Sequence, residues 1–260
     1  MRVLIWMISA VGLVSLPAYA QTAEEQGLAI AVEADQRDRG WGDATADMTM
    51  ILRNRQGETS ERRIRVRTLE VEGDGDKSMT IFDHPADVNG TAFLSHTHAT
   101  EADDQWLYLP ALKRVKRIAS ANKSGPFVGS EFAYEDISSQ ELPKYQYKYL
   151  RDEALGGQDA FVVERIPQYR HSGYTRQVVW LDKEHYRVLK VEYFDRKGAH
   201  LKTLFARDYR QYLDKYWRAH TMEMVNHRNG KSTVLSWSNF QFGNGFSERD
   251  FERNSLKRVR

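Results

Sequence analysis

The stretch ATADMTMILRNRQGETSERRIRVRT, residues 44–68, holds two runs of alternating residues separated by a turn at Gln56-Gly57. The first run has an apolar residue at every second position: Ala44, Ala46, Met48, Met50 and Leu52. The second run alternates arginines with Ile64, Val66 and Thr68. Because successive side chains of a β-strand point to opposite faces, this stretch predicts two strands joined by a turn. The first strand has one wholly apolar face, and the second has a charged outer face.

Short strand-like runs continue through the rest of the chain, and several are separated by turn pairs such as Asn89-Gly90 and Asn229-Gly230. The expected strands cover residues 77–83, 91–97, 105–109, 114–118, 145–149, 160–166, 174–181, 187–194, 201–207, 216–225 and 233–240. About a dozen strands at near-regular spacing predict an all-β meander or barrel. Within it, only an N-terminal helix and residues 130–141 interrupt the strand pattern.

The N-terminal helix is predicted by a capping box, in which Thr22 precedes Glu25 by three residues. Apolar residues then recur at helical spacing until the charged run at 37–39 and Gly40. Residues 1–20 instead resemble a secretory signal peptide: Arg2, an uncharged apolar run over 3–16 and an Ala18-Tyr19-Ala20 cleavage site. We therefore expect export to the periplasm and cleavage, which leaves one domain over 21–260 that does not span the membrane.

The composition excludes several classes of protein. The chain has 260 residues, of which 41% are hydrophobic and 28% are charged, and it contains no cysteine. It is too apolar for a disordered chain and too polar for a polytopic membrane protein. Without cysteine there are no disulfides, thiolate zinc sites or iron–sulfur clusters. A net charge of +2 gives no reason to expect a nucleic-acid partner.

Motifs for catalysis are missing from the sequence, including nucleophile elbows, phosphate-binding loops and paired-histidine zinc helices. The best metal candidate is His96-Thr97-His98, which Asp103 and Asp104 could supplement. Two imidazoles alone do not define a metal site, so we interpret this segment as the polar end of a strand. The sequence therefore predicts neither an enzyme nor a cofactor or metal site.

Two groups of residues are candidates for binding. The apolar positions of the opening hairpin are the candidate lining for acyl chains: Ala46, Met48, Met50, Leu52, Ile64 and Val66. Ordinary core packing is the alternative for this set. A basic run is the candidate for docking on anionic lipid headgroups or an acidic partner: Lys113, Arg114, Lys116 and Arg117, anchored by Phe127 in the loop that follows. For Phe127, the alternative is that the loop folds back and this ring plugs a cavity.

Two segments closely resemble the signature of the LolA-like outer membrane lipoprotein-sorting protein family: residues 106–118 and 124–136. Their most specific parts are WLYLPALKRVKRI and SGPFVGSEF. Residues 46–50, 87–91, 187–193 and 251–258 resemble other motifs of the same family. The resemblance implies a mainly β fold: an unclosed antiparallel β-barrel, or half barrel, that surrounds a hydrophobic cavity and carries a helical lid.

The same resemblance implies a function without catalysis. A relative of this kind carries lipoprotein acyl chains, or other lipids, through the periplasm toward the outer membrane. It also implies association with an inner-membrane transporter of the RND type. The alternative is an accessory protein that docks on such a transporter without ferrying cargo.

Overall fold

The computed structural model describes residues 21–258, so the predicted signal peptide lies outside the described residues. Within this described part of the chain, thirteen antiparallel strands form one sheet. The strands are β1 (Asp43–Arg53), β2 (Thr59–Leu69), β3 (Lys77–His84), β4 (Ala92–His96), β5 (Asp104–Leu109), β6 (Arg114–Arg117), β7 (Tyr145–Leu155), β8 (Gln158–Pro167), β9 (Tyr174–Asp182), β10 (Val188–Asp195), β11 (His200–Tyr212), β12 (Tyr216–Asn226) and β13 (Ser232–Phe242).

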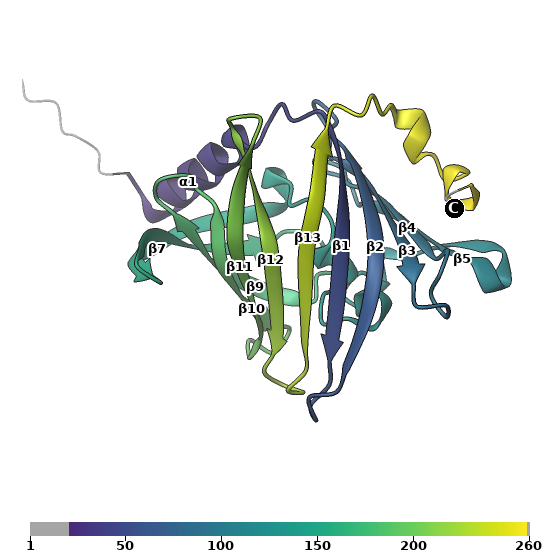
Figure 1. Cartoon of the computed structure of the whole chain (residues 1–260). Helices are drawn as coiled ribbons and strands as arrows, with labels where there is room; N and C mark the ends of the chain where they lie inside the picture. The colour runs from purple at the N-terminus through teal and green to yellow at the C-terminus, as the bar shows by residue number, and fades with distance from the viewer. Residues whose placement is uncertain (1–20, 259–260) are drawn as a thin grey trace, which may run out of the picture.

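The sheet order shows two meanders joined side by side. Strands β1 to β6 follow one another outward from the centre, β13 to β7 do so in the other direction, and β1 pairs with β13. Strands β6 and β7 are the two edges, so the sheet is unclosed. It curls around the segment between β6 and β7 (Figure 1). This arrangement confirms the expected unclosed antiparallel half barrel.

The register of the opening hairpin gathers its apolar residues on the concave face. Met48 of β1 pairs with Ile64 of β2 on one side and with Trp237 of β13 on the other. Met50, whose side chain is fully buried, pairs with Leu235. These residues belong to the main hydrophobic cluster of the protein. The alternation in the sequence therefore assigned the buried face of this hairpin correctly.

One α-helix, α1 (Ala23–Arg37), packs against the edge strand β7. The capping box is present: the Glu25 amide donates to Thr22 Oγ1 at 3.1 Å, and the Thr22 amide donates to Glu25 Oε2 at 2.9 Å. Gly27 and Ile30 are the buried residues of the helix. The helix expected from the sequence is confirmed at both ends.

The segment between β6 and β7, residues 118–144, fills much of the concave side as a series of short 3₁₀ turns. We call this segment the insert. Phe127 and Phe132 of the insert are buried in the main cluster. The centroid of the Phe127 ring lies 5.2 Å from the ring centroid of Phe93 and 5.9 Å from that of Phe82. The space beneath the hairpin is therefore occupied by the protein's own aromatic side chains.

The insert is also held by a buried ion pair. Lys202 Nζ of β11 lies 2.6 Å from Asp136 Oδ2 and donates to the carbonyl of Glu131 at 2.9 Å. Tyr174 Oη donates to Asp136 Oδ1 at 2.8 Å. Since both charged side chains are almost fully buried, their mutual pairing offsets the cost of removing them from water.

The C-terminal segment, residues 243–258, covers the outer face of β3 to β5 (Figure 1). Phe251 and Leu256 are fully buried there against Met79, Ile81 and Leu94. The outer face of this half of the sheet is therefore also packed. Within residues 21–258, no helix is both long and apolar enough to cross a membrane.

Candidate functional site

A cavity of about 1260 Å³ lies between the C-terminal end of α1 and the concave face of the sheet. Its lining comes from α1, the β2–β3 loop, the end of the insert and strands β7 to β12. Its size exceeds the roughly 300–1,000 Å³ that is usual for a small-molecule pocket. The cavity therefore suits a bulky or long ligand.

The floor of the cavity is apolar. It is formed by Val163, Val179 and Leu181, which lie side by side on β8 and β9, together with Tyr147 of β7. Ala31 and Ala34 of α1 face the cavity from the helix. Small side chains on the helix leave room above the floor, so an apolar chain can lie between the two.

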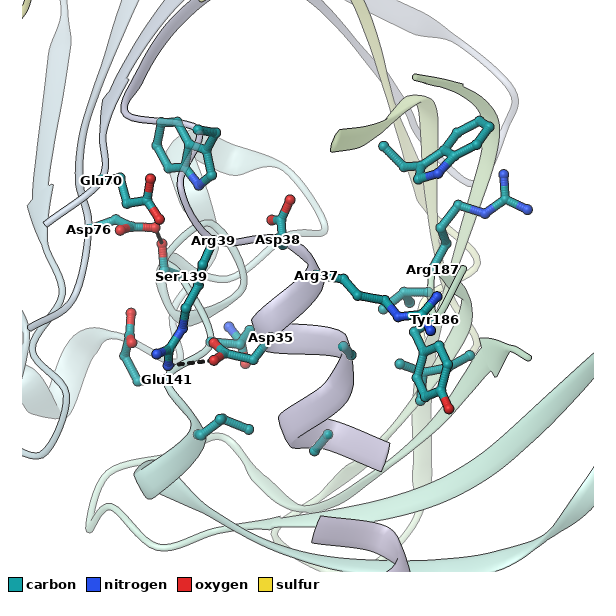
Figure 2. Close-up of a pocket in the computed structure, with 18 of the residues that line it drawn as sticks. Asp35, Arg37, Asp38, Arg39, Glu70, Asp76, Ser139, Glu141, Tyr186 and Arg187 are labelled. Atoms are coloured by element: carbon teal, nitrogen blue, oxygen red, sulfur yellow. Dashed lines mark hydrogen bonds and ion pairs between the residues drawn. The ribbon is translucent and has the colours of Figure 1, made fainter. Parts of the chain in front are cut away.

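One wall of the cavity is acidic and comes from the β2–β3 loop and the insert (Figure 2). Glu70 accepts hydrogen bonds from the amides of Gly40 and Gly42 at 2.7 and 2.8 Å, which ties this wall to the segment after α1. Ser139 Oγ donates to Asp76 Oδ2 at 3.1 Å. Burial, and then the charge of the nearby Glu141, raise the pKa of Asp76 to about 6.

The opposite wall is basic and aromatic (Figure 2). The Arg37 guanidinium of α1 lies 4.3 Å from the ring centre of Tyr186 and donates to the Glu184 carbonyl at 2.8 Å. Arg187 pairs with the buried Asp182 at 2.9 Å and lies 4.5 Å from the Trp217 ring. This wall therefore holds cations with aromatic rings beside them, facing carboxylates across the cavity.

An apolar floor below two charged walls matches the shape of an amphiphile. The tail would lie on the floor, while polar or charged headgroups would meet the rim. Among residues 21–258, no three His, Asp or Glu side chains are placed to hold a metal ion together.

Comparison with known proteins agrees with this architecture. A family described as one of uncharacterized proteins matches residues 74–258. A solved domain from Vibrio parahaemolyticus, described as an outer membrane lipoprotein-sorting protein domain, is 64% identical; the match covers 90% of this chain and 99% of that one, with a TM-score of 0.89. The chain belongs to the LolA-like family of outer membrane lipoprotein-sorting proteins.

Two further solved structures resemble this LolA-like chain. A protein of the DUF1329 family from Desulfovibrio piger is 31% identical over 90% of this chain and 99% of that one, with a TM-score of 0.86. A LolA superfamily protein from Nitrosomonas europaea shares the fold at 20% identity and a TM-score of 0.71, covering 91% of this chain and 100% of that one. None of the curated proteins matches the chain.

The structure places the predicted acyl-chain lining beside the insert. Of the six residues, Ala46, Met48, Met50, Ile64 and Val66 are buried on the concave side, four of them in the main cluster with Phe127. None of the six is among the residues that line the large cavity. Leu52 lines a smaller pocket of about 300 Å³ near the turn between β1 and β2. Their contact with acyl chains stays a prediction, and one that requires the insert to move.

The structure separates the predicted docking residues. Lys113, Arg114, Lys116 and Arg117 are exposed at or beside the edge strand β6. Phe127 is fully buried among the rings of Phe82, Phe93 and Tyr134, so it has no surface with which to contact a partner. The expectation that Phe127 anchors docking is corrected here. This ring packs into the interior. The alternative, that it plugs a cavity, stays a prediction, because Phe127 is not among the residues that line the large cavity.

The histidines of the metal candidate are engaged separately. His96 Nε2 lies 2.7 Å from the Phe251 carbonyl, and His98 Nδ1 lies 2.8 Å from Asp74 Oδ2. Asp103 instead pairs with two lysines of the insert, the buried Lys123 and the partly buried Lys144. The two imidazoles therefore fix the C-terminal segment and the β2–β3 loop, and Asp103 fixes the two ends of the insert.

Sequence reasoning missed the residues that line the cavity. The sequence predicts only a helix end over 37–40 and a turn over 73–76, and both segments line the cavity. Their clustered charges were the available signal. That signal does not say which loops meet in space, because the cavity forms only when the sheet curls.

Proposed function

We propose that this chain is a periplasmic carrier that binds the acyl chains of lipoproteins, or of other lipids, in the cavity beneath α1 for transfer toward the outer membrane. The observation that carries the proposal is the large cavity, with its apolar floor of Val163, Val179 and Leu181 and its two charged walls. Membership in a lipoprotein-sorting family supports the same conclusion.

The energetics favour a carrier of this form. An exposed acyl chain costs about 0.8 kcal/mol per methylene in water, and a dry apolar surface removes that cost. The charged walls keep the polar end of the cargo near the rim. Neither binding nor release requires bond making, so side chains that only pack and pair are sufficient.

The proposed location is the periplasm, reached through the signal peptide predicted over residues 1–20. Its support is the n-region arginine, the apolar run and the Ala18-Tyr19-Ala20 site. Sequencing of the protein recovered from a periplasmic extract should find Gln21 at its N-terminus. Recovery of a membrane-bound form that retains Met1 would contradict this location.

Binding can be tested with a matched pair of helix variants. Ala34 of α1 lines the cavity, whereas Ala29 is on the exposed side of the same helix. Ala34→Trp should fill the space and weaken binding of a fluorescent palmitoyl ester at least tenfold. Ala29→Trp should leave it unchanged. Native mass spectrometry of the wild type should show bound lipid, and a wild type that binds no acyl compound in either assay would overturn the proposal.

A second candidate is an accessory protein that docks on a transporter of the RND type without carrying cargo. The exposed cations of β6 favour it, because a basic edge attracts an acidic surface. This candidate predicts a protein that is free of lipid after purification and that binds an acidic partner in a salt-dependent manner.

A further inference from the structure

The sheet contains a place where two neighbouring strands separate. Strands β12 and β13 pair from Val225 and Ser232 up to Thr221 and Ser236. Beyond that point the facing segments are residues 216–220 of β12 and residues 237–242 of β13. Their paired residues have partners on the far side only: 216–219 pair with β11, and 237, 238, 241 and 242 pair with β1. The two strands diverge toward the end of the sheet that carries α1 (Figure 1). We call these two facing segments the seam.

Aromatic rings, rather than a hydrogen-bonded ladder, connect the two sides of the seam. Tyr212 lies 5.3 Å from Phe240, and Tyr216 lies 6.4 Å from Phe242, measured between ring centroids. Phe240 is stacked between Phe242, at 6.5 Å, and Trp237, at 6.0 Å. One hydrogen bond to the backbone also crosses the seam, between the His220 imidazole and the backbone of Trp237. Opening the seam therefore costs that bond and the ring contacts, but no ladder of backbone-to-backbone hydrogen bonds.

The seam also holds an unsatisfied donor. The indole Nε1 of Trp237 is buried, and no acceptor within residues 21–258 lies in hydrogen-bonding range. Buried polar groups in folded proteins nearly always have a partner, so an orphan indole points to an acceptor supplied from outside the chain. The carbonyl oxygen of an ester or amide is such an acceptor.

The seam adjoins the cavity. Trp217, within the seam segment of β12, lines the cavity, and so does Trp41. The Arg218 guanidinium lies 5.8 Å from the ring centroid of Trp41 and 5.8 Å from that of Phe242. One side chain therefore bridges a ring of the cavity and a ring of the seam, so a chain leaving the cavity at this point meets aromatic surface.

We propose that the seam is a lateral passage through which an acyl chain moves between the cavity and the surroundings, with its ester or amide carbonyl accepting a hydrogen bond from Trp237 Nε1. The inference rests on the proposed carrier function. A lateral passage lets the tail slide between the strands while the polar headgroup stays in water, which avoids drawing a charge through the apolar interior.

The test uses the absence of native cysteine, which allows pairs to be introduced and bridged with a short bis-maleimide. The seam bridge is Ala219→Cys with Ser238→Cys, the positions that would continue the register beyond Thr221 and Ser236. The control bridge is Glu223→Cys with Val234→Cys, which already pair. Bridging the seam should slow exchange of a fluorescent palmitoyl ester at least tenfold, whereas the control bridge should not change it.

A second measurement does not depend on bridging. A palmitoyl ester with a diazirine on its tail should label the peptide that contains residues 237–242. Trp237→Phe keeps an aromatic ring but removes the indole N–H, and it should weaken ester binding several-fold. Binding without labelling of the seam, or with equal exchange in both bridged proteins, would overturn the passage and leave the carrier function standing. A wild type that binds no acyl ester would overturn both.

Discussion

Gly27 of α1 lies directly on the backbone of Tyr149 in β7. A Cβ at this position would come within 2.6 Å of the Tyr149 amide nitrogen and within 2.7 Å of two backbone atoms of Lys148. Backbone atoms of a paired strand cannot move aside easily. The helix therefore sits as close to the edge strand as it does because residue 27 has no side chain.

Gly27→Ala should push α1 away from β7. We expect the free energy of unfolding in urea to fall by about 1–3 kcal/mol, the usual cost of overpacking. Leu28→Ala is the control, since the Leu28 side chain is exposed, and it should change stability by at most about 0.5 kcal/mol. A Gly27→Ala protein as stable as the wild type would show that the helix can shift on the sheet.

Asp76 should make the protein less stable as pH rises. Its pKa is raised to about 6 in the folded state by burial and by Glu141, so folding favours the protonated form. The stabilisation is fully present below the unfolded pKa of roughly 3.9 and is lost as pH rises toward the folded pKa. Asp76→Asn should therefore raise the free energy of unfolding by about 1–3 kcal/mol at pH 7 and hardly at all at pH 3.5.

Asp74→Asn provides a control, because its effect on the free energy of unfolding at pH 7 should have the opposite sign. Hydrogen bonds from His98 and from the Ala99 amide lower the pKa of Asp74 in the folded protein. Its substitution should therefore reduce stability at pH 7 and lose that effect as pH falls. Equal responses of Asp74→Asn and Asp76→Asn across the pH range would contradict these assignments.

Lys202→Met should be one of the most damaging single changes, because it leaves Asp136 charged and buried without its partner. We expect a loss of about 3–5 kcal/mol in chemical denaturation. Lys190→Met is the matched control: its partner Glu192 lies 2.6 Å away, but the pair is more exposed, so the loss should be about 1 kcal/mol or less. Similar losses for both variants would show that burial of the Lys202–Asp136 pair is not what matters.

Replacing Lys113, Arg114, Lys116 and Arg117 with Gln should weaken binding to vesicles that contain phosphatidylglycerol. The wild type should also lose this binding as salt rises, because screening is strong beyond roughly 10 Å at 0.1 M ionic strength. The control removes the same charge elsewhere, with Gln at Arg53, Arg55, Arg63 and Lys231, which are also exposed. Equal vesicle binding by both quadruple variants would exclude a role for β6.

The strands were predictable because the alternation of apolar and polar residues that indicates a strand lies within a few consecutive residues. The run Ala44–Leu52 defined both the strand and its buried face, and the capping box at Thr22 fixed the start of α1. The fold class also followed from the resemblance. Each of these predictions depends on neighbours in the sequence.

The cavity was not predictable for the opposite reason. The sequence pointed to the wall around Met50, but the insert places Phe127 and Phe132 against that region. The insert has short 3₁₀ turns without a repeating period, so its path could not be read from the pattern. Lys123 follows the basic run in the sequence, but its partner Asp103 lies 20 residues earlier, so this buried pair could not be predicted from neighbouring residues.

The joining of β1 to β13 has a consequence for how this chain folds. All other strand pairs within residues 21–258 connect consecutive strands, so each meander can form from contacts that are close in sequence. The β1–β13 ladder, in contrast, brings Met48 to Trp237 across most of the chain. Loop closure over that distance is entropically costly, and non-local contacts slow folding. We therefore expect the two meanders to form early and the pairing of β1 with β13 to be the slow, rate-limiting step of folding. Variants of β1 should then slow refolding more than variants of β8.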